Sequence, residues 1–159
     1  MSLQKSIVQA AGLALCALLT TYASAQTYGP PALDIATAKK IAAGAAAEAT
    51  KNSWKVAIAV VDTHGSLIYF ERLDDTQTGS VAIAMDKANV GAVFRRPSRV
   101  FEERANKGSP SVLGLRGATT SAGGLPIVIG GRIVGGIGVS GVTSDQDEQT
   151  AAAGAAMVK

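Results

Sequence analysis

A chain of 159 residues has the length of one domain, and its 47% hydrophobic content supplies enough apolar surface for a core. Aromatic residues make up only 4%, so this core has to be built largely from small side chains. The net charge of +3 is spread along the chain without a run of five or more Lys and Arg residues, and we expect no nucleic-acid partner.

The first 25 residues have the features of a secretory signal peptide. Lys5 supplies the positive charge, and residues 7–19 form an apolar stretch that is too short to span a bilayer comfortably. Residues 23–25, Ala-Ser-Ala, form a small-residue cleavage site. We expect a mature chain that begins at Gln26, is periplasmic or secreted, and keeps no integral membrane anchor.

The only cysteine, Cys16, lies inside this peptide, so the mature chain has neither a disulfide nor a cysteine ligand for a metal. Residues 26–33 contain Gly-Pro-Pro, which blocks both helix and strand, and we expect them to form a linker. A single domain then occupies residues 34–159.

The domain is expected to begin with a helix and two strands. Asp34 is a good N-cap for a helix that continues to about Lys51, because apolar and small residues recur there at helical spacing. Residues 54–61 are apolar on both faces, which is typical of a central strand covered on both sides. A turn over residues 62–65 leads to a partner strand over 66–73.

The middle of the chain predicts two helices and a loop. The first helix covers residues 78–95 and ends before Pro97, and a short polar helix over 98–106 has Ser98 as its cap. Residues 109–122 are rich in Ser, Gly and Thr and predict a loop with room for a short strand.

The stretch 123–141, GGLPIVIGGRIVGGIGVSG, organises the rest of the chain. Two apolar runs separated by Gly130 and Gly131 predict a β-hairpin with a primed turn, because glycine accepts a positive φ. The glycines of the second run indicate either a helix packed closely on the sheet or the approach of a ligand. A last helix is expected from Ser144, with Asp147 as the second member of a capping box.

This order of elements predicts an α/β (α+β) protein with a mainly antiparallel sheet of about five strands and helices packed on it. Four segments carry a more specific signal: VVDTHGSLIYFERLDD, AIAMDKANVGAVF, the glycine-rich stretch, and SDQDEQTAAAGAA. They resemble the GlcG/HbpS family of haem-binding-like proteins, to which the C-terminal domain of PduO-type proteins is related. The resemblance implies a profilin-like three-layer α/β/α fold with a five-stranded antiparallel sheet, a homo-oligomer and, for some members, bound haem.

Five residues form the predicted ligand site. His64, the only histidine, lies in the first turn, and a neutral imidazole is a good axial ligand for haem iron. Alternatively, His64 is a turn residue that is exposed to water and binds no ligand. Arg72 and Lys87 would meet haem propionates or a substrate carboxylate, although surface roles fit them equally. Gly124 and Pro126, near the start of the glycine-rich stretch, complete the set.

Other reactive side chains also have structural explanations. Tyr69 is a second candidate ligand for haem iron, but core positions flank it. Glu102 and Glu103 suit acid–base work and equally suit a solvated helix face. Ser140 lies in GVSG rather than in a GxSxG motif, and we do not predict a nucleophile there.

Three functions remain open at this point. The first is an exported protein that binds haem or a related tetrapyrrole, which the family resemblance favours. The second is a small-molecule enzyme or accessory protein that acts on a carboxylated or aromatic metabolite through Lys87 and an acid. The third is a structural oligomer within a larger complex. The sequence assigns no catalytic residue.

Overall fold

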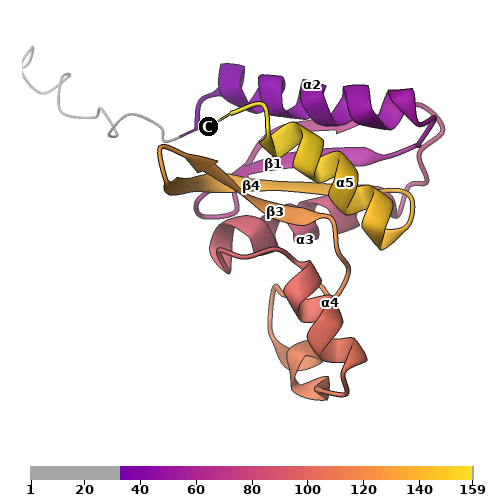
Figure 1. Ribbon diagram of the computed structural model, residues 1–159, viewed down its shortest axis with the longest axis vertical. Coiled ribbons are helices and arrows are strands. Elements are labelled where there is room, and N and C mark those ends of the chain that lie inside the picture. The colour runs from indigo at the N-terminus through magenta and orange to yellow at the C-terminus, as the bar shows by residue number, and fades with distance from the viewer. Residues whose placement is uncertain (1–32, 159) are drawn as a thin grey trace, which may run out of the picture. The chain divides into compact units, whose positions relative to one another are not determined.

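A computed structural model describes residues 33–158, which form an antiparallel sheet of four strands between two layers of helices (Figure 1). The strand order is β2-β1-β4-β3. The central strands are therefore β1 (Ala57–Asp62) and β4 (Arg132–Ser140), and the edges are β2 (Leu67–Arg72) and β3 (Gly124–Ile129).

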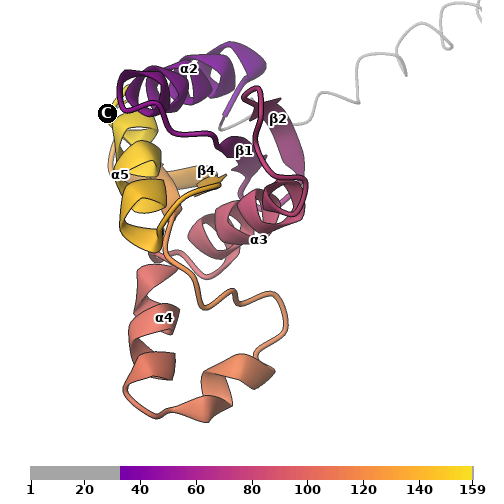
Figure 2. The same ribbon diagram turned by 90° about the vertical axis from the view of Figure 1, so that its right-hand side faces the viewer.

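The helices divide between the two faces of the sheet (Figure 2). One face is covered by α2 (Ile35–Lys51) and α5 (Ser144–Ala155), and the other by α3 (Ser80–Val93). The short helix α4 (Arg99–Asn106) and the 3-10 helix η2 (Pro110–Gly114) project beside these layers. Within the described part of the chain, no helix is both long enough and apolar enough to cross a membrane.

The expected signal peptide and most of the expected linker lie outside the described residues. Leu33, the last residue of the expected linker, is only 4% exposed and packs into the core on the α2 side of the sheet. The core therefore includes this residue as well as the helix that follows it.

The expectation of five strands is wrong, because the described residues contain four. Residues 109–122, where a short strand had room, form η2 and irregular turns instead. Pro110 has no N–H to donate to a neighbouring strand, and Gly117 adopts a φ of 78° that breaks an extended backbone.

Both faces of β1 are buried, as its apolar sequence predicts. The α2 and α5 side holds the larger side chains, and the α3 side holds mostly alanine. The residues on the α2 and α5 side, from β1 and the position before it, are Val56, Ile58 and Val60. Those facing α3 are Ala57, Ala59 and Val61, which pack against Ala84, Ala88 and Ala92. Because alanines meet alanines, α3 lies close to the sheet.

The glycines of β4 make this close approach possible. A Cβ added to Gly138 would collide with the backbone of Ala84 and Ala88, and one added to Gly136 would collide with the carbonyl of Ala88. The prediction of a closely packed helix is therefore confirmed for these two glycines. It is wrong for Gly135, which faces away from α3.

Two local predictions are confirmed. Gly130 and Gly131 have φ values of 56° and 74°, as a primed hairpin turn requires. Asp34 caps α2, since its Oδ1 accepts a hydrogen bond from the Thr37 N–H at 2.7 Å.

The cap of α5 lies one residue earlier than predicted. Thr143 accepts a hydrogen bond from the Gln146 N–H at 3.4 Å, and the Gln146 side chain accepts one from the Thr143 N–H at 3.2 Å. Ser144 and Asp147 have the same spacing, but the Asp147 side chain turns into the interior and is not available as a cap.

Candidate functional site

An ion pair in the interior joins the two helix layers. Nζ of Lys87, from α3, lies 2.7 Å from Oδ2 of Asp147, from α5, and the two side chains are 1% and 3% exposed. Oδ1 of Asp147 accepts a hydrogen bond from the Val142 N–H at 3.1 Å. Burial raises the pKa of the Asp147 carboxyl above its ordinary value, although hydrogen bonding to Lys87 and the charge of Lys87 act in the opposite direction.

The absence of a side chain at Gly123 leaves space for this ion pair. A Cβ added there would lie 2.8 Å from Cβ of Asp147 and 3.2 Å from Nζ of Lys87, and the residue has a φ of 117°. Any larger residue would therefore push against the pair. The amine of Lys87 is buried and bound to Asp147, so it is not free to bind a ligand.

The backbone of Gly124 has a structural role, because both its N–H and its carbonyl form hydrogen bonds with Ser98. Its N–H donates to Oγ of Ser98 at 2.9 Å, and its carbonyl accepts from the Ser98 N–H at 2.9 Å. The same Oγ donates to the carbonyl of Ser121 at 2.8 Å. Ser98 therefore does not cap α4 with its side chain, as the sequence predicted, but ties the start of α4 to the start of β3.

The turn between β1 and β2 holds His64 on the surface. Oδ1 of Asp62 accepts hydrogen bonds from the N–H groups of His64 and Ser66, at 2.8 and 2.9 Å. The imidazole is exposed, and its Nδ1 lies 3.4 Å from Oγ1 of Thr63. The backbone of this turn is therefore fixed while the imidazole remains accessible to a ligand.

A cleft of about 390 Å³ opens next to this turn. We call it the turn-end cleft, because three chain reversals meet there: the β1–β2 turn, the end of α3 and the β3–β4 turn. Its lining residues are Thr63, Ala92, Arg95, Gly131, Arg132 and Ile133. Two of the six carry guanidinium groups, so the cleft suits an anionic ligand.

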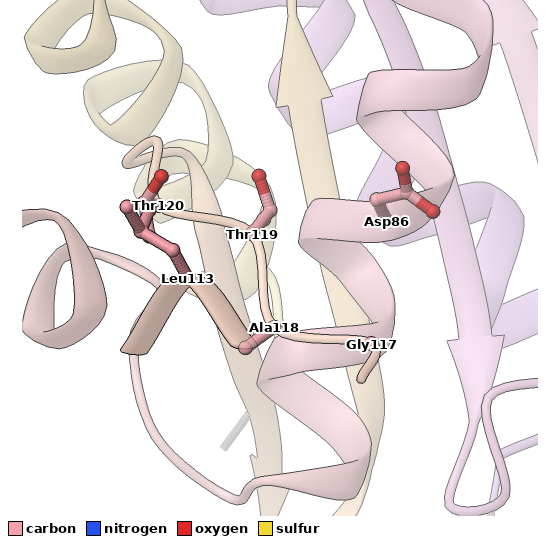
Figure 3. A pocket seen from close by; sticks show the side chains of 6 residues that line it. All are labelled: Asp86, Leu113, Gly117, Ala118, Thr119 and Thr120. Atoms are coloured by element: carbon pink, nitrogen blue, oxygen red, sulfur yellow. The ribbon is translucent and has the colours of Figure 1, made fainter. Parts of the chain in front are cut away.

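A second cleft of about 390 Å³ lies between α3 and the loop after η2. Its lining residues are Asp86, Leu113, Gly117, Ala118, Thr119 and Thr120. In Figure 3, Asp86 comes from α3, whereas Thr119 and Thr120 come from the loop opposite it. This α3–loop cleft presents a carboxylate and hydroxyl groups, which suit hydrogen-bond donors and cations.

The structure does not bring the five predicted ligand residues together. His64 lies in the β1–β2 turn, whereas Arg72 lies at the far end of β2, about 17 Å of strand away. Lys87 is buried in its ion pair, and Gly124 is bonded to the start of α4. Pro126 lies on the edge strand β3 and is partly buried.

Tyr69, the other candidate for haem iron, is partly buried on β2. Its hydroxyl donates to Oε2 of Glu71 at 3.4 Å, and the negative charge of Glu71 raises the pKa of the phenol. The phenol is therefore already held by a carboxylate of the same strand.

Arg99 and Glu102 hold α4 in place, whereas the exposed Glu103 lies 3.7 Å from Nζ of Lys107. Arg99 donates to Oδ1 of Asp145 at 2.7 Å and also to Glu148, both on α5. Glu102 accepts a hydrogen bond from the Ser144 hydroxyl at 2.7 Å. These contacts dock α4 on the first turns of α5 and account for Glu102 without acid–base chemistry.

Sequence reasoning missed Arg95 and Arg132. Arg95 is the last residue of the helix predicted over 78–95, and Arg132 directly follows the Gly-Gly turn. A basic residue is unremarkable at either position. Only the packing of α3 against β4 brings the two positions to one cleft. Within residues 33–158, no three His, Cys, Asp or Glu side chains gather to hold a metal ion.

Comparison with known proteins identifies the class of this fold. Residues 33–156 match the family described as "Haem degrading protein HbpS-like", so the chain belongs to the HbpS-like family and the resemblance drawn from its sequence is confirmed. Protein GlcG of Escherichia coli is 40% identical over 103 residues, which are 65% of this chain and 77% of GlcG.

Two solved structures show the same fold. A double mutant of HbpS from Streptomyces reticuli superposes with a TM-score of 0.74 at 31% identity, covering 86% of this chain and 93% of that one. PduOC, solved as a complex with haem, superposes with a TM-score of 0.71 at 23% identity, covering 80% of this chain and 95% of that one.

Proposed function

We propose that this protein binds haem or a related tetrapyrrole at the turn-end cleft, with His64 as the ligand of the iron. Haem presents a metal that accepts imidazole and two propionates that pair with guanidinium groups. The observation that carries the proposal is the position of His64, which directly follows a wall residue of the cleft that contains two arginines. The family of the chain and the haem complex of PduOC support the choice of ligand.

Charge favours this cleft over the other. The α3–loop cleft offers the carboxylate of Asp86, which repels propionates, whereas the turn-end cleft offers two positive charges. Bound haem would supply iron-centred redox chemistry. The residues of the chain would ligate the iron and fix the orientation of the ring.

Titration of the mature chain with ferric haem tests this proposal. His64→Ala should shift the Soret maximum and weaken haem affinity about tenfold or more, the scale of a loss of about 1.4 kcal/mol. Tyr69→Phe removes the competing phenol and should leave both the spectrum and the affinity unchanged. An unchanged spectrum and affinity in His64→Ala would contradict the role of His64, and a loss in Tyr69→Phe would transfer that role to Tyr69.

A small carboxylated metabolite is the second candidate ligand, because two arginines in one cleft bind a carboxylate whether or not it belongs to a porphyrin. In this case the protein is an enzyme or accessory protein rather than a haem binder. A thermal-shift screen of haem and small carboxylates separates the two functions, since a ligand that binds only the folded state raises its stability.

We also propose that the protein is exported after cleavage and forms a homo-oligomer. The open sheet supports self-association, because β2 and β3 are both edge strands and carry exposed apolar side chains. Leu67 on β2 is 51% exposed and Val128 on β3 is 42% exposed. Light scattering of the mature chain at micromolar concentration should give a mass above that of the monomer, and a monomer alone would contradict this proposal.

A further inference from the structure

We infer that Arg95 and Arg132 form a carboxylate-binding site in the turn-end cleft and hold a ligand that carries two carboxylates. For a porphyrin, these would be the propionates. The identity of the ligand rests on the proposed function, but the chemistry of the site rests on the two arginines themselves. The site replaces Arg72 and Lys87 as the predicted partners of the propionates.

The two guanidinium groups come to the cleft from different elements. Arg95 follows the last residues of α3, and Arg132 is the first residue of β4, directly after the Gly-Gly turn. Thr63, from the β1–β2 turn, completes the wall and places His64 at the same end of the sheet. An imidazole and two guanidinium groups therefore lie at one end of the molecule.

Neither arginine forms an ion pair with another described residue. Among residues 33–158, no Asp or Glu oxygen lies within 4.0 Å of Arg95 or Arg132. Arg96, by contrast, donates through Nε to the carbonyl of Phe94 at 3.0 Å. The carboxylate of Asp62 is occupied by backbone N–H groups of its own turn.

The backbone at Arg95 is left-handed, as it also is at Ser53 and Asp75. Arg95 has a φ of 56°, in the left-handed region where glycine is the usual residue after a helix. A non-glycine residue in this region costs about 1–2 kcal/mol. Arg95→Gly can therefore remove the guanidinium group without adding backbone strain.

Lys87 and Arg72, which the sequence predicted to bind the propionates, are less well placed than Arg95 and Arg132. Reaching a propionate with Lys87 would leave Asp147 buried without a counter-charge, because both side chains are almost fully enclosed. Arg72 lies at the opposite end of β2 from His64. A single porphyrin ligated by His64 therefore meets Arg95 and Arg132 more readily.

Affinity measurements with haem and with haem dimethyl ester test the inference, since esterification removes both carboxylates. The variants are Arg95→Gly, which relieves the backbone strain, and Arg132→Gln, alone and combined. Arg104→Gln on α4 is the matched control, because it removes one exposed positive charge elsewhere. Each cleft variant should weaken haem affinity about tenfold, or by about 1.4 kcal/mol, whereas Arg104→Gln and Arg72→Gln should not.

Affinity for the ester and the position of the Soret maximum distinguish loss of a carboxylate contact from damage to the cleft. Affinity for the ester should hardly change in the cleft variants, and the Soret maximum should stay in place because the iron ligand is intact. Unchanged haem affinity in both variants would overturn the inference while leaving the proposed function standing. Equal losses for haem and ester would also overturn it, since they indicate damage to the cleft rather than loss of a carboxylate contact.

If the wild-type chain takes up no haem, the proposed function fails and succinate decides the inference. Stabilisation of the wild type by succinate in a thermal-shift assay should disappear in the double variant. The absence of stabilisation in the wild type, or an equal response in both proteins, would overturn the carboxylate site.

Discussion

Nζ of Lys87 lies 2.7 Å from Oδ2 of Asp147, and this contact joins helices that cover opposite faces of the sheet. The pair passes beside Gly123, just before the edge strand β3, where the lack of a side chain leaves room for it. Substituting either residue leaves the other charge buried without compensation, which strongly destabilises a fold. A single substitution in this pair should therefore have a large effect on stability.

Removing one charge of the pair should strongly destabilise the protein. Lys87→Met leaves the Asp147 carboxylate buried without a partner and should lower the free energy of unfolding by about 3–5 kcal/mol, measured by urea denaturation. Lys87→Met combined with Asp147→Leu should cost much less than the two single substitutions together. The control is Lys51→Met, because Lys51 is 76% exposed and lies 4.0 Å from Glu48. Equal stability of Lys87→Met and wild type would contradict this account.

The Lys87–Asp147 pair should also change how the free energy of unfolding depends on pH. Burial raises the pKa of Asp147 in the folded chain above the ordinary value of 3.8 that applies when it is unfolded. As the pH rises above 3.8, the unfolded chain releases this proton first. The stability that the carboxyl contributes is therefore complete below 3.8 and is lost as the pH rises through the folded pKa.

The measurement compares wild type with the uncharged double variant Lys87→Met with Asp147→Leu at several acidic pH values. The free energy of unfolding of wild type minus that of the variant should fall as the pH rises above 3.8. A difference that grows with pH in this range would show that the Asp147 pKa is lowered by Lys87 rather than raised by burial.

Gly138→Ala should weaken the packing of α3 on the sheet. The added Cβ meets the backbone of Ala84 and Ala88, which cannot move without displacing the helix. Overpacking of this kind costs about 1–3 kcal/mol. Gly79→Ala is the matched control, because nothing lies within 4 Å of its added Cβ and its φ is −61°. Similar urea midpoints for the two variants would contradict the packing argument.

Local signals in the sequence predicted the features that depend on neighbouring residues. The apolar faces of β1, the cap at Asp34 and the primed turn at Gly130 and Gly131 all follow from residue type and spacing. The predicted cap of α5 was one residue too late, because Ser144 and Thr143 both carry a hydroxyl group that can cap a helix. Only the tertiary contact with Lys87 shows that Asp147 is used elsewhere.

Features that join distant segments were not predictable in this way. The role of Ser98 depends on Gly124 lying beside it, and the turn-end cleft depends on the end of α3 meeting the β3–β4 turn. Arg95 and Arg132 carry no pattern that distinguishes them from other surface arginines. Their significance appears only once the sheet order and the position of α3 are known.

Export gives a prediction that is independent of the fold. Lys5, the apolar stretch over residues 7–19 and the Ala-Ser-Ala sequence over residues 23–25 predict cleavage before Gln26. Mass spectrometry of the protein from its native host should therefore find a chain that begins at Gln26. Intact Met1 on a soluble cytoplasmic form would contradict the expectation.

Diffraction at the iron absorption edge, from crystals of the mature chain grown with haem, tests the central claim most directly because it locates the iron. The account predicts an anomalous peak beside the imidazole of His64, with Arg95 and Arg132 as the nearest positive groups to the propionates. A peak in the α3–loop cleft beside Asp86, or at any position remote from His64, would contradict it.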